Sequence, residues 1–169
     1  VFLGAFFYGV VYTVILKRRT WLNIVIGGLA GSFAVLAGAT GVAPDEIGPV
    51  ALSLAWVLFL WTPPHFWSLA IACHDDYRAA GGPMLPVVVG DARAARAVLG
   101  GTVALVASSF LPLAFGLGPL YAAGAAVGGF LFVRAASRLA AAPSRATAFA
   151  SFHASLAQLT PLLLGVIEI

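Results

Sequence analysis

The chain has 169 residues, of which 62% are hydrophobic and 9% charged, with a net charge of +3 and a mean hydropathy of +1.03. Because a soluble domain carries about 25% charged residues, this composition excludes a soluble globular protein and predicts an all-α bundle of transmembrane helices in a lipid bilayer. The basic residues are spread over short connections between apolar runs, which excludes the single basic face of a nucleic-acid-binding protein.

Six apolar segments are predicted to be membrane-crossing helices: about 1–16, 22–40, 48–72, 97–115, 119–133 and 147–167. A spanning helix needs about 20 apolar residues, so the first and fifth segments are short, and the long third segment must tilt or kink. The first segment has neither an initiating Met nor a charged leader region. We therefore expect a single domain, 1–169, that begins inside a transmembrane helix and lacks an N-terminal portion.

The charged residues sort by connection along these segments. Basic residues follow the first, third and fifth segments, namely Lys17, Arg18, Arg19, Arg78, Arg93, Arg96, Arg134, Arg138 and Arg145. Asp45, Glu46 and Glu168 fall on the opposite side of the membrane. Because connections rich in Lys and Arg remain in the cytoplasm, the basic side is predicted to be cytoplasmic.

The third segment carries the most informative pattern, which starts as WTPPHFW and ends in an acidic pair. If the helix is regular beyond Pro64, Asp76 shares a face with His65 and lies roughly 16 Å from it along the axis. An ionisable residue inside the membrane is by default a functional-site hypothesis. His65, Asp75 and Asp76 are therefore candidate catalytic residues.

Each of these features also has a structural explanation. The two prolines can form a packing kink, His65 can make an interhelical hydrogen bond, and the carboxylates can balance Arg78 at a helix end. The connection that follows, from Cys73 to Arg96, is long and rich in Pro and Gly, and we expect an ordered cap with a functional role. Carboxylates beside arginines at a membrane surface suit Mg²⁺, which binds oxygen ligands and bridges to substrate phosphates.

Small and polar residues in the other helices are predicted to pack helices together. The glycines of 22–40 and 119–133 recur at a spacing that lets helices approach closely in lipid; they are Gly27, Gly28, Gly31, Gly38, Gly124, Gly128 and Gly129. Thr147, Ser151, Ser155 and Gln158 form a polar stripe on the last segment. We expect this stripe to form interhelical hydrogen bonds.

Three ordered motifs resemble the protohaem IX farnesyltransferase (haem O synthase) family of the UbiA-type intramembrane prenyltransferase superfamily. They are YTVILKRRTWLNIVIGG at 12–28, WTPPHFW at 61–67 and DYRAAGGPMLPVVVG at 76–90. The resemblance implies a nine-helix bundle, of which this chain would supply the last six helices. The first acidic motif of the family is absent from this chain, so we expect the chain alone to be inactive. Ala79 and Ala80 stand where the wider superfamily carries a second acid, which argues against aromatic-acid prenyltransferases.

The activity implied is transfer of a farnesyl group from farnesyl diphosphate to a vinyl group of haem B. Asp76 and Asp75 would bind Mg²⁺, and haem B would be a substrate rather than a cofactor. Substrate contacts are implied for Lys17, Arg18, Arg19, Asn23, Tyr77, Arg78, Trp61 and Phe66. The implied location is the bacterial inner membrane, and the implied partners are haem A synthase or the terminal-oxidase assembly.

Three other functions remain open from the sequence. A prenyltransferase of the same superfamily would use a quinone or chlorophyll-type acceptor. A membrane transporter would also contain a helix broken by prolines at mid-membrane. A structural subunit of a respiratory complex would leave the acidic pair and the cap without a purpose.

Overall fold

A computed structural model describes residues 2–16, 19–42 and 47–166 of the chain. The first apolar segment is helical, with α1 at Phe2–Phe6 continuing as the π-helix η1 at Phe7–Leu16. The long helices are α2 (Asn23–Val42), α3 (Pro49–Ala72), α6 (Asp91–Ser108), α7 (Pro119–Ala141) and α8 (Arg145–Val166). A short 3-10 helix, η2 (Leu111–Phe115), follows α6. No strand occurs among the described residues, so the all-α prediction is confirmed.

Five of the described helical segments are long and apolar enough to cross a membrane. They are Asn23–Gly41, Pro49–Ala72, Asp91–Phe115, Pro119–Ala141 and Arg145–Val166. With the shorter first segment, they account for the six apolar segments predicted from the sequence. The protein is therefore a multi-pass membrane protein.

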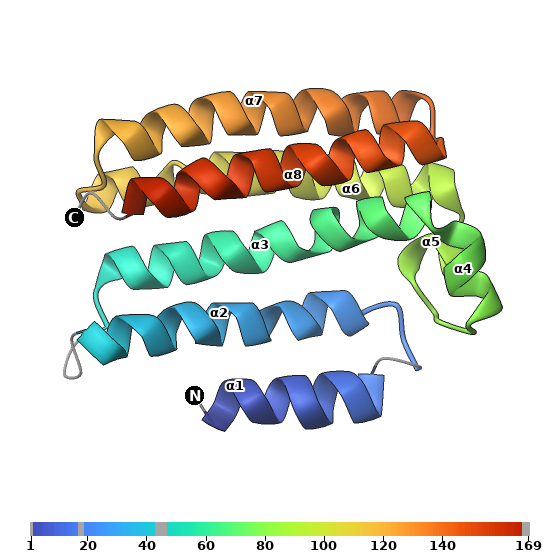
Figure 1. The fold of residues 1–169 in the computed structure, drawn as a ribbon, viewed down its shortest axis with the longest axis horizontal. Helices are drawn as coiled ribbons and strands as arrows, with labels where there is room; N and C mark the ends of the chain where they lie inside the picture. Colours follow the sequence, from blue (N-terminus) through green and yellow to red (C-terminus); the bar gives the residue numbers. More distant parts are fainter. Residues whose placement is uncertain (1, 17–18, 43–46, 167–169) are drawn as a thin grey trace.

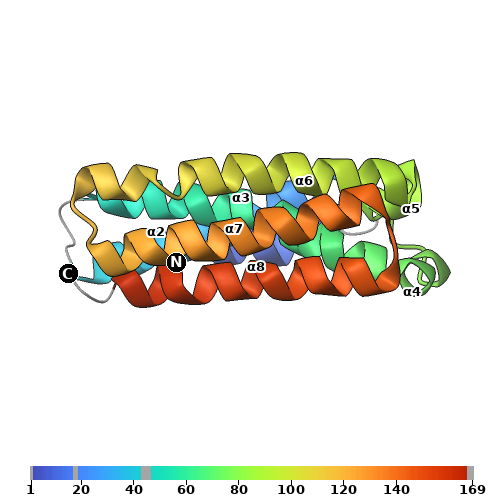
Figure 2. The same cartoon turned by 90° about the horizontal axis from the view of Figure 1, so that it is seen from above.

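The long helices run antiparallel to one another in chain order (Figure 1). Helices α3, α6, α7 and α8 pack into a four-helix core, α2 packs on α3, and η1 packs on α2 (Figures 1 and 2). One end of the bundle carries two short helices, α4 (His74–Ala79) and α5 (Leu85–Val89), which lie beside the start of α6 (Figure 1). We call residues 73–90 the cap.

The cap is held to the bundle by buried apolar side chains. Met84 and Leu85 are 5% and 4% exposed and pack in one cluster with Trp67 of α3 and Val98 of α6. Gly90 has φ of 84° between α5 and α6, a left-handed conformation that glycine adopts without strain. The prediction of an ordered cap is therefore confirmed.

Close helix contacts explain the glycines of α7. A Cβ on Gly128 would lie 2.7 Å from Cα of Gln158, and one on Gly124 would lie 2.9 Å from Cβ of Pro161, so α7 and α8 approach closely there. On α2, a Cβ at Gly28 would lie 3.2 Å from Thr62 of α3. Gly38 has open space around it. The predicted packing role is confirmed where the helices touch.

Two details differ from the sequence-based expectation. Helix α6 begins at Asp91 and α7 extends to Ala141, so four arginines predicted in connections lie on helices: Arg93, Arg96, Arg134 and Arg138. Helix α3 passes through Pro63 and Pro64 without ending, as the single predicted segment 48–72 requires. The predicted regular helix from His65 to Asp76 is wrong, because α3 ends at Ala72 and the chain turns at Cys73 before α4 begins.

Candidate functional site

His65 lies buried between α3 and α8. Its Nδ1 is 2.7 Å from Oγ of Ser155, and its ring stacks between Trp61 and Phe152, with centroids 4.0 and 4.5 Å away. The Ser155 hydroxyl donates its single proton to the Phe152 carbonyl at 2.6 Å. It therefore accepts its second hydrogen bond from His65 Nδ1–H. The structure gives His65 the interhelical contact that the sequence left open; its catalytic role stays a prediction.

Three of the four residues of the polar stripe on α8 contact a neighbouring helix, Ser151 and Ser155 on α3 and Gln158 at the end of α6. Ser151 Oγ lies 3.0 Å from Ser68 Oγ, and Gln158 Nε2 donates to Ser109 Oγ at 3.4 Å. These contacts confirm the predicted interhelical role of Ser151, Ser155 and Gln158. The expectation is wrong for Thr147, whose hydroxyl bonds with Ser144 and the backbone at the start of α8.

Trp61 is also part of this interface. Its Nε1 donates to the backbone carbonyl of Ser155 at 3.0 Å, and the side chain is 8% exposed. Phe66 is 37% exposed and lies on a different side of α3. The structure therefore separates two aromatic residues that the resemblance placed together at the substrate.

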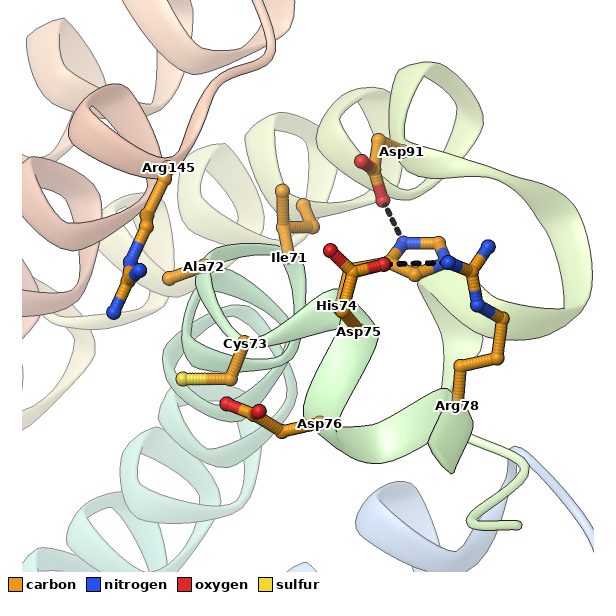
Figure 3. A pocket seen from close by; sticks show the side chains of 9 residues that line it. All are labelled: Ile71, Ala72, Cys73, His74, Asp75, Asp76, Arg78, Asp91 and Arg145. Carbon is orange, nitrogen blue, oxygen red and sulfur yellow. Dashed lines mark hydrogen bonds and ion pairs between the residues drawn. The ribbon is translucent and has the colours of Figure 1, made fainter. Parts of the chain in front are cut away.

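The turn at Cys73 exposes the acidic pair at the mouth of the bundle. A cavity of about 520 Å³, here the carboxylate cavity, is lined by Ile71, Ala72, Cys73, His74, Asp75, Asp76, Arg78, Asp91 and Arg145 (Figure 3). Arg78 donates to Asp75 at 2.6 Å, and both side chains are exposed. Asp76 points away from Arg78, toward Cys73, and lines the same cavity (Figure 3). Within the described part of the chain, its carboxylate has no hydrogen-bond or ion-pair partner.

A contact between two side chains also fixes the cap. His74 Nδ1 lies 2.6 Å from Asp91 Oδ1, which links α4 to the first residue of α6 (Figure 3). Neither residue was singled out from the sequence, because the pair joins positions whose proximity depends on the fold of the intervening cap. Arg145, at the start of α8, lines the cavity from the opposite side (Figure 3). Its place in this cavity was likewise not foreseen.

A second cavity lies on the other side of α4. This tyrosine cavity has a volume of about 350 Å³ and is lined by Tyr12, Asn23, Ile24, Phe66, Tyr77, Ala80, Gly82 and Met84. Asn23 is buried and donates to Met84 Sδ at 3.9 Å. Burial, followed by the nearby Cys73, raises the pKa of the Tyr77 phenol above its usual value of 10.0. The Tyr77 hydroxyl therefore keeps its proton at neutral pH and can donate a hydrogen bond.

The predicted site residues thus fall into three groups. Asp75, Asp76 and Arg78 line the carboxylate cavity, whereas Asn23, Phe66 and Tyr77 line the tyrosine cavity. His65 and Trp61 lie in the interface between α3 and α8. Arg19 is exposed just before α2, and Lys17 and Arg18 lie outside the described residues. Because α4 carries both Asp76 and Tyr77, it forms a wall of both cavities.

Comparison with known proteins places the chain in a family. The model of the UbiA prenyltransferase family matches residues 1–156. The chain belongs to this family. It is 60% identical to protoheme IX farnesyltransferase 2 of Paramagnetospirillum magneticum, over 98% of the chain and 57% of that protein. It is 53% identical to protoheme IX farnesyltransferase 1 of the same organism, over 98% of the chain and 58% of that protein.

The similarity to UbiA-family proteins extends to archaea. The protoheme IX farnesyltransferase of Halobacterium salinarum is 44% identical over 95% of the chain and 36% of that protein. The chain thus spans little more than half the length of the curated relatives described above, and less of the archaeal one. No solved structure matches the chain.

Proposed function

We propose that the intact protein to which this chain belongs transfers a farnesyl group from farnesyl diphosphate to a vinyl group of haem B. With the addition of water, the products are haem O and diphosphate. The observation that carries this proposal is the 60% identity, over almost the whole chain, to a protein named protoheme IX farnesyltransferase. The two cavities on either side of α4 support it, because one is lined by charged groups and the other mainly by apolar ones.

The carboxylates of α4 fit one side of a Mg²⁺ site. Mg²⁺ is usually held by one or two carboxylates plus substrate phosphates and keeps several waters. Asp76 offers a carboxylate without a protein partner among the described residues, and Asp75 is next to it. The described residues contain no group of three or more acids, His or Cys that could hold a metal by themselves. When bound, Mg²⁺ would neutralise the negative charge that develops on the leaving diphosphate.

The basic residues around α4 would hold the diphosphate and the haem propionates. Arg78 is exposed at the carboxylate cavity, and Arg145 faces it from α8. Arg guanidinium groups bind phosphate and carboxylate oxygens through paired, charge-assisted hydrogen bonds. We assign the same role to Arg19, Lys17 and Arg18, the basic residues that precede α2.

The tyrosine cavity would receive the apolar part of a substrate. Tyr12, Ile24 and Phe66 also line a smaller cavity of about 170 Å³, which extends along α2 and α3 to Gly27 and Thr62. An isoprenoid chain could lie along this path, with Asn23 and Tyr77 as the polar groups at its end. His65 and Trp61 would act by holding α3 against α8, so that Phe66 faces the cavity.

The location proposed is the bacterial inner membrane, with the cap in the cytoplasm. All described Arg residues belong to the cap end: each precedes α2, lies in the cap, starts α6 or α8, or falls in the last turns of α7. Connections rich in Arg remain on the cytoplasmic side. Haem O would then pass to haem A synthase or to the assembly of a terminal oxidase.

The proposal is tested by weighing the haem product of the intact protein. Membranes containing it would receive haem B, farnesyl diphosphate and Mg²⁺, and extracted haems would be analysed by mass spectrometry. We expect a mass gain of one farnesyl group plus water. If the folded protein leaves haem unmodified and prenylates a quinone precursor instead, the acceptor is the quinone precursor and not haem B. Uptake of solutes by vesicles without any prenylation would indicate a transporter.

A further inference from the structure

The last three long helices carry an unusual excess of positive charge. No Asp or Glu occurs between Asp91 and Glu168, whereas this stretch contains Arg93, Arg96, Arg134, Arg138 and Arg145. The ion pairs found among the described residues are His74 with Asp91 and Arg78 with Asp75, so none of these five arginines is neutralised by a described acid. Their exposed guanidinium groups are therefore available to an anion from outside this part of the chain.

Two of these arginines line a groove between α7 and α8, which run side by side (Figures 1 and 2). The groove has a volume of about 320 Å³ and is lined by Leu131, Arg134, Ala135, Arg138, His153, Ala154 and Ala157. Arg134, Arg138 and His153 are all exposed. We call this site the basic groove; it is separate from both cavities beside α4.

The face of α7 that forms the groove changes from apolar to basic along its length. Val127, Leu131, Arg134 and Arg138 follow one another at spacings of four, three and four, which places them on one side of the helix. Val127 and Leu131 are 62% and 43% exposed. The apolar residues lie toward the membrane interior, and the arginines lie toward the cap end. This order matches the acyl chain and headgroup of a membrane lipid.

We propose that the basic groove binds the headgroup of an anionic phospholipid. Arg134 and Arg138 would bind the phosphate oxygens, since guanidinium groups match phosphate geometry, and the imidazole of His153 would donate one further hydrogen bond. The acyl chain would lie over Leu131 and Val127. Basic pockets between transmembrane helices on the cytoplasmic side are suited to such headgroups. The proposal is independent of the reaction catalysed.

The test compares lipid binding by the intact protein and two double variants. Native mass spectrometry would follow titration with phosphatidylglycerol and, separately, with phosphatidylcholine. For Arg134→Gln/Arg138→Gln we expect the affinity for phosphatidylglycerol to fall about 30-fold, because each basic residue contributes about 1 kcal/mol at a membrane surface. Binding of phosphatidylcholine should not change. The matched control, Arg93→Gln/Arg96→Gln, removes two exposed arginines of α6 at the same end and should retain the site.

A third variant keeps the charge and fills the groove. Ala157→Leu leaves both arginines in place, and we expect it also to weaken phosphatidylglycerol binding. Equal losses in the two double variants would show a general effect of surface charge and overturn the proposal. So would wild-type binding in Arg134→Gln/Arg138→Gln. Displacement of the lipid by millimolar inorganic phosphate would also overturn it, because the site would then recognise a free anion.

Discussion

Single residues of α4 differ in their surroundings although they are adjacent in sequence. Asp75 is engaged by Arg78 at 2.6 Å, whereas Asp76 points away from Arg78, toward Cys73 (Figure 3). An ion pair between exposed groups contributes little to stability. The ion pair between Asp75 and Arg78 therefore has its main effect on the availability of the carboxylates. It occupies Asp75 and leaves Asp76 available to a metal or substrate.

At the same scale, the hydrogen bond between His65 and Ser155 predicts a stability effect. Ser155→Ala leaves the buried Nδ1–H of His65 without its acceptor, at a cost of about 1–3 kcal/mol. Thr160→Ala on the same helix removes an exposed hydroxyl whose one hydrogen bond within the described part of the chain is to the Leu156 carbonyl, and should cost less than about 0.5 kcal/mol. Unfolding of the intact protein in detergent measures both. Equal effects of the two substitutions would contradict the role given to His65.

Among the elements, α4 depends on its link to α6. Asp91→Ala removes the acceptor of the His74 hydrogen bond, so α4 should lose its fixed position above α3. We expect about a tenfold loss of kcat/KM for farnesyl diphosphate, since small displacements of positioning groups reduce rates strongly. Because the pair is partly exposed, with side-chain exposures of 23% and 40%, global stability should change little.

A conservative substitution of Asp91 tests whether the loss of activity comes from the missing hydrogen bond to His74. Asp91→Asn keeps an oxygen that can accept from His74, and it should restore most of the activity lost in Asp91→Ala. Steady-state kinetics with farnesyl diphosphate as the varied substrate measures the difference. If both variants behave like the wild-type protein, the ion pair does not position α4 for the reaction.

The close contact between helices α7 and α8 predicts that a larger residue at Gly128 lowers the stability of the protein. In Gly128→Ala the new Cβ would meet Cα of Gln158 at 2.7 Å, so the helices must move apart. Overpacking of this kind costs about 1–3 kcal/mol. Gly100→Ala on α6 meets nothing within 4 Å and should be neutral or slightly stabilising. Thermal unfolding would distinguish them, and an undiminished melting temperature in Gly128→Ala would argue against the close contact.

For the molecule as a whole, the sequence predicted the apolar helices well because hydrophobic length alone determines them. The end of the third segment at 72 agrees with the structure, but the regular helix assumed from His65 to Asp76 does not, because neither Gly nor Pro marks the turn at Cys73. A single non-helical residue there was enough to move Asp76 off the face that carries His65. The contacts of His65 with Ser155 and of His74 with Asp91 were also out of reach, since residues that meet only in the folded bundle leave no local spacing to detect.

The end of α7 was also not predictable from the apolar pattern of the sequence. Arg134 and Arg138 end an apolar run, so the sequence assigned them to a connection, although α7 continues to Ala141. Long arginine side chains can extend from a helix to the membrane surface, which lets the helix run past its apolar part. The basic groove between α7 and α8 follows from this continuation, and only the structure reveals it.

The central claim is that the cap of the intact protein supplies Asp76 to a reaction of farnesyl diphosphate. The most direct measurement is the initial rate of haem farnesylation by Asp76→Asn and Asp75→Asn, with unfolding curves as the check on folding. We expect Asp76→Asn to lose about 100-fold or more, as when a group that stabilises developing charge is removed. Asp75→Asn should lose less, because Asp75 is already paired with Arg78. A folded Asp76→Asn protein with the wild-type rate would contradict the account.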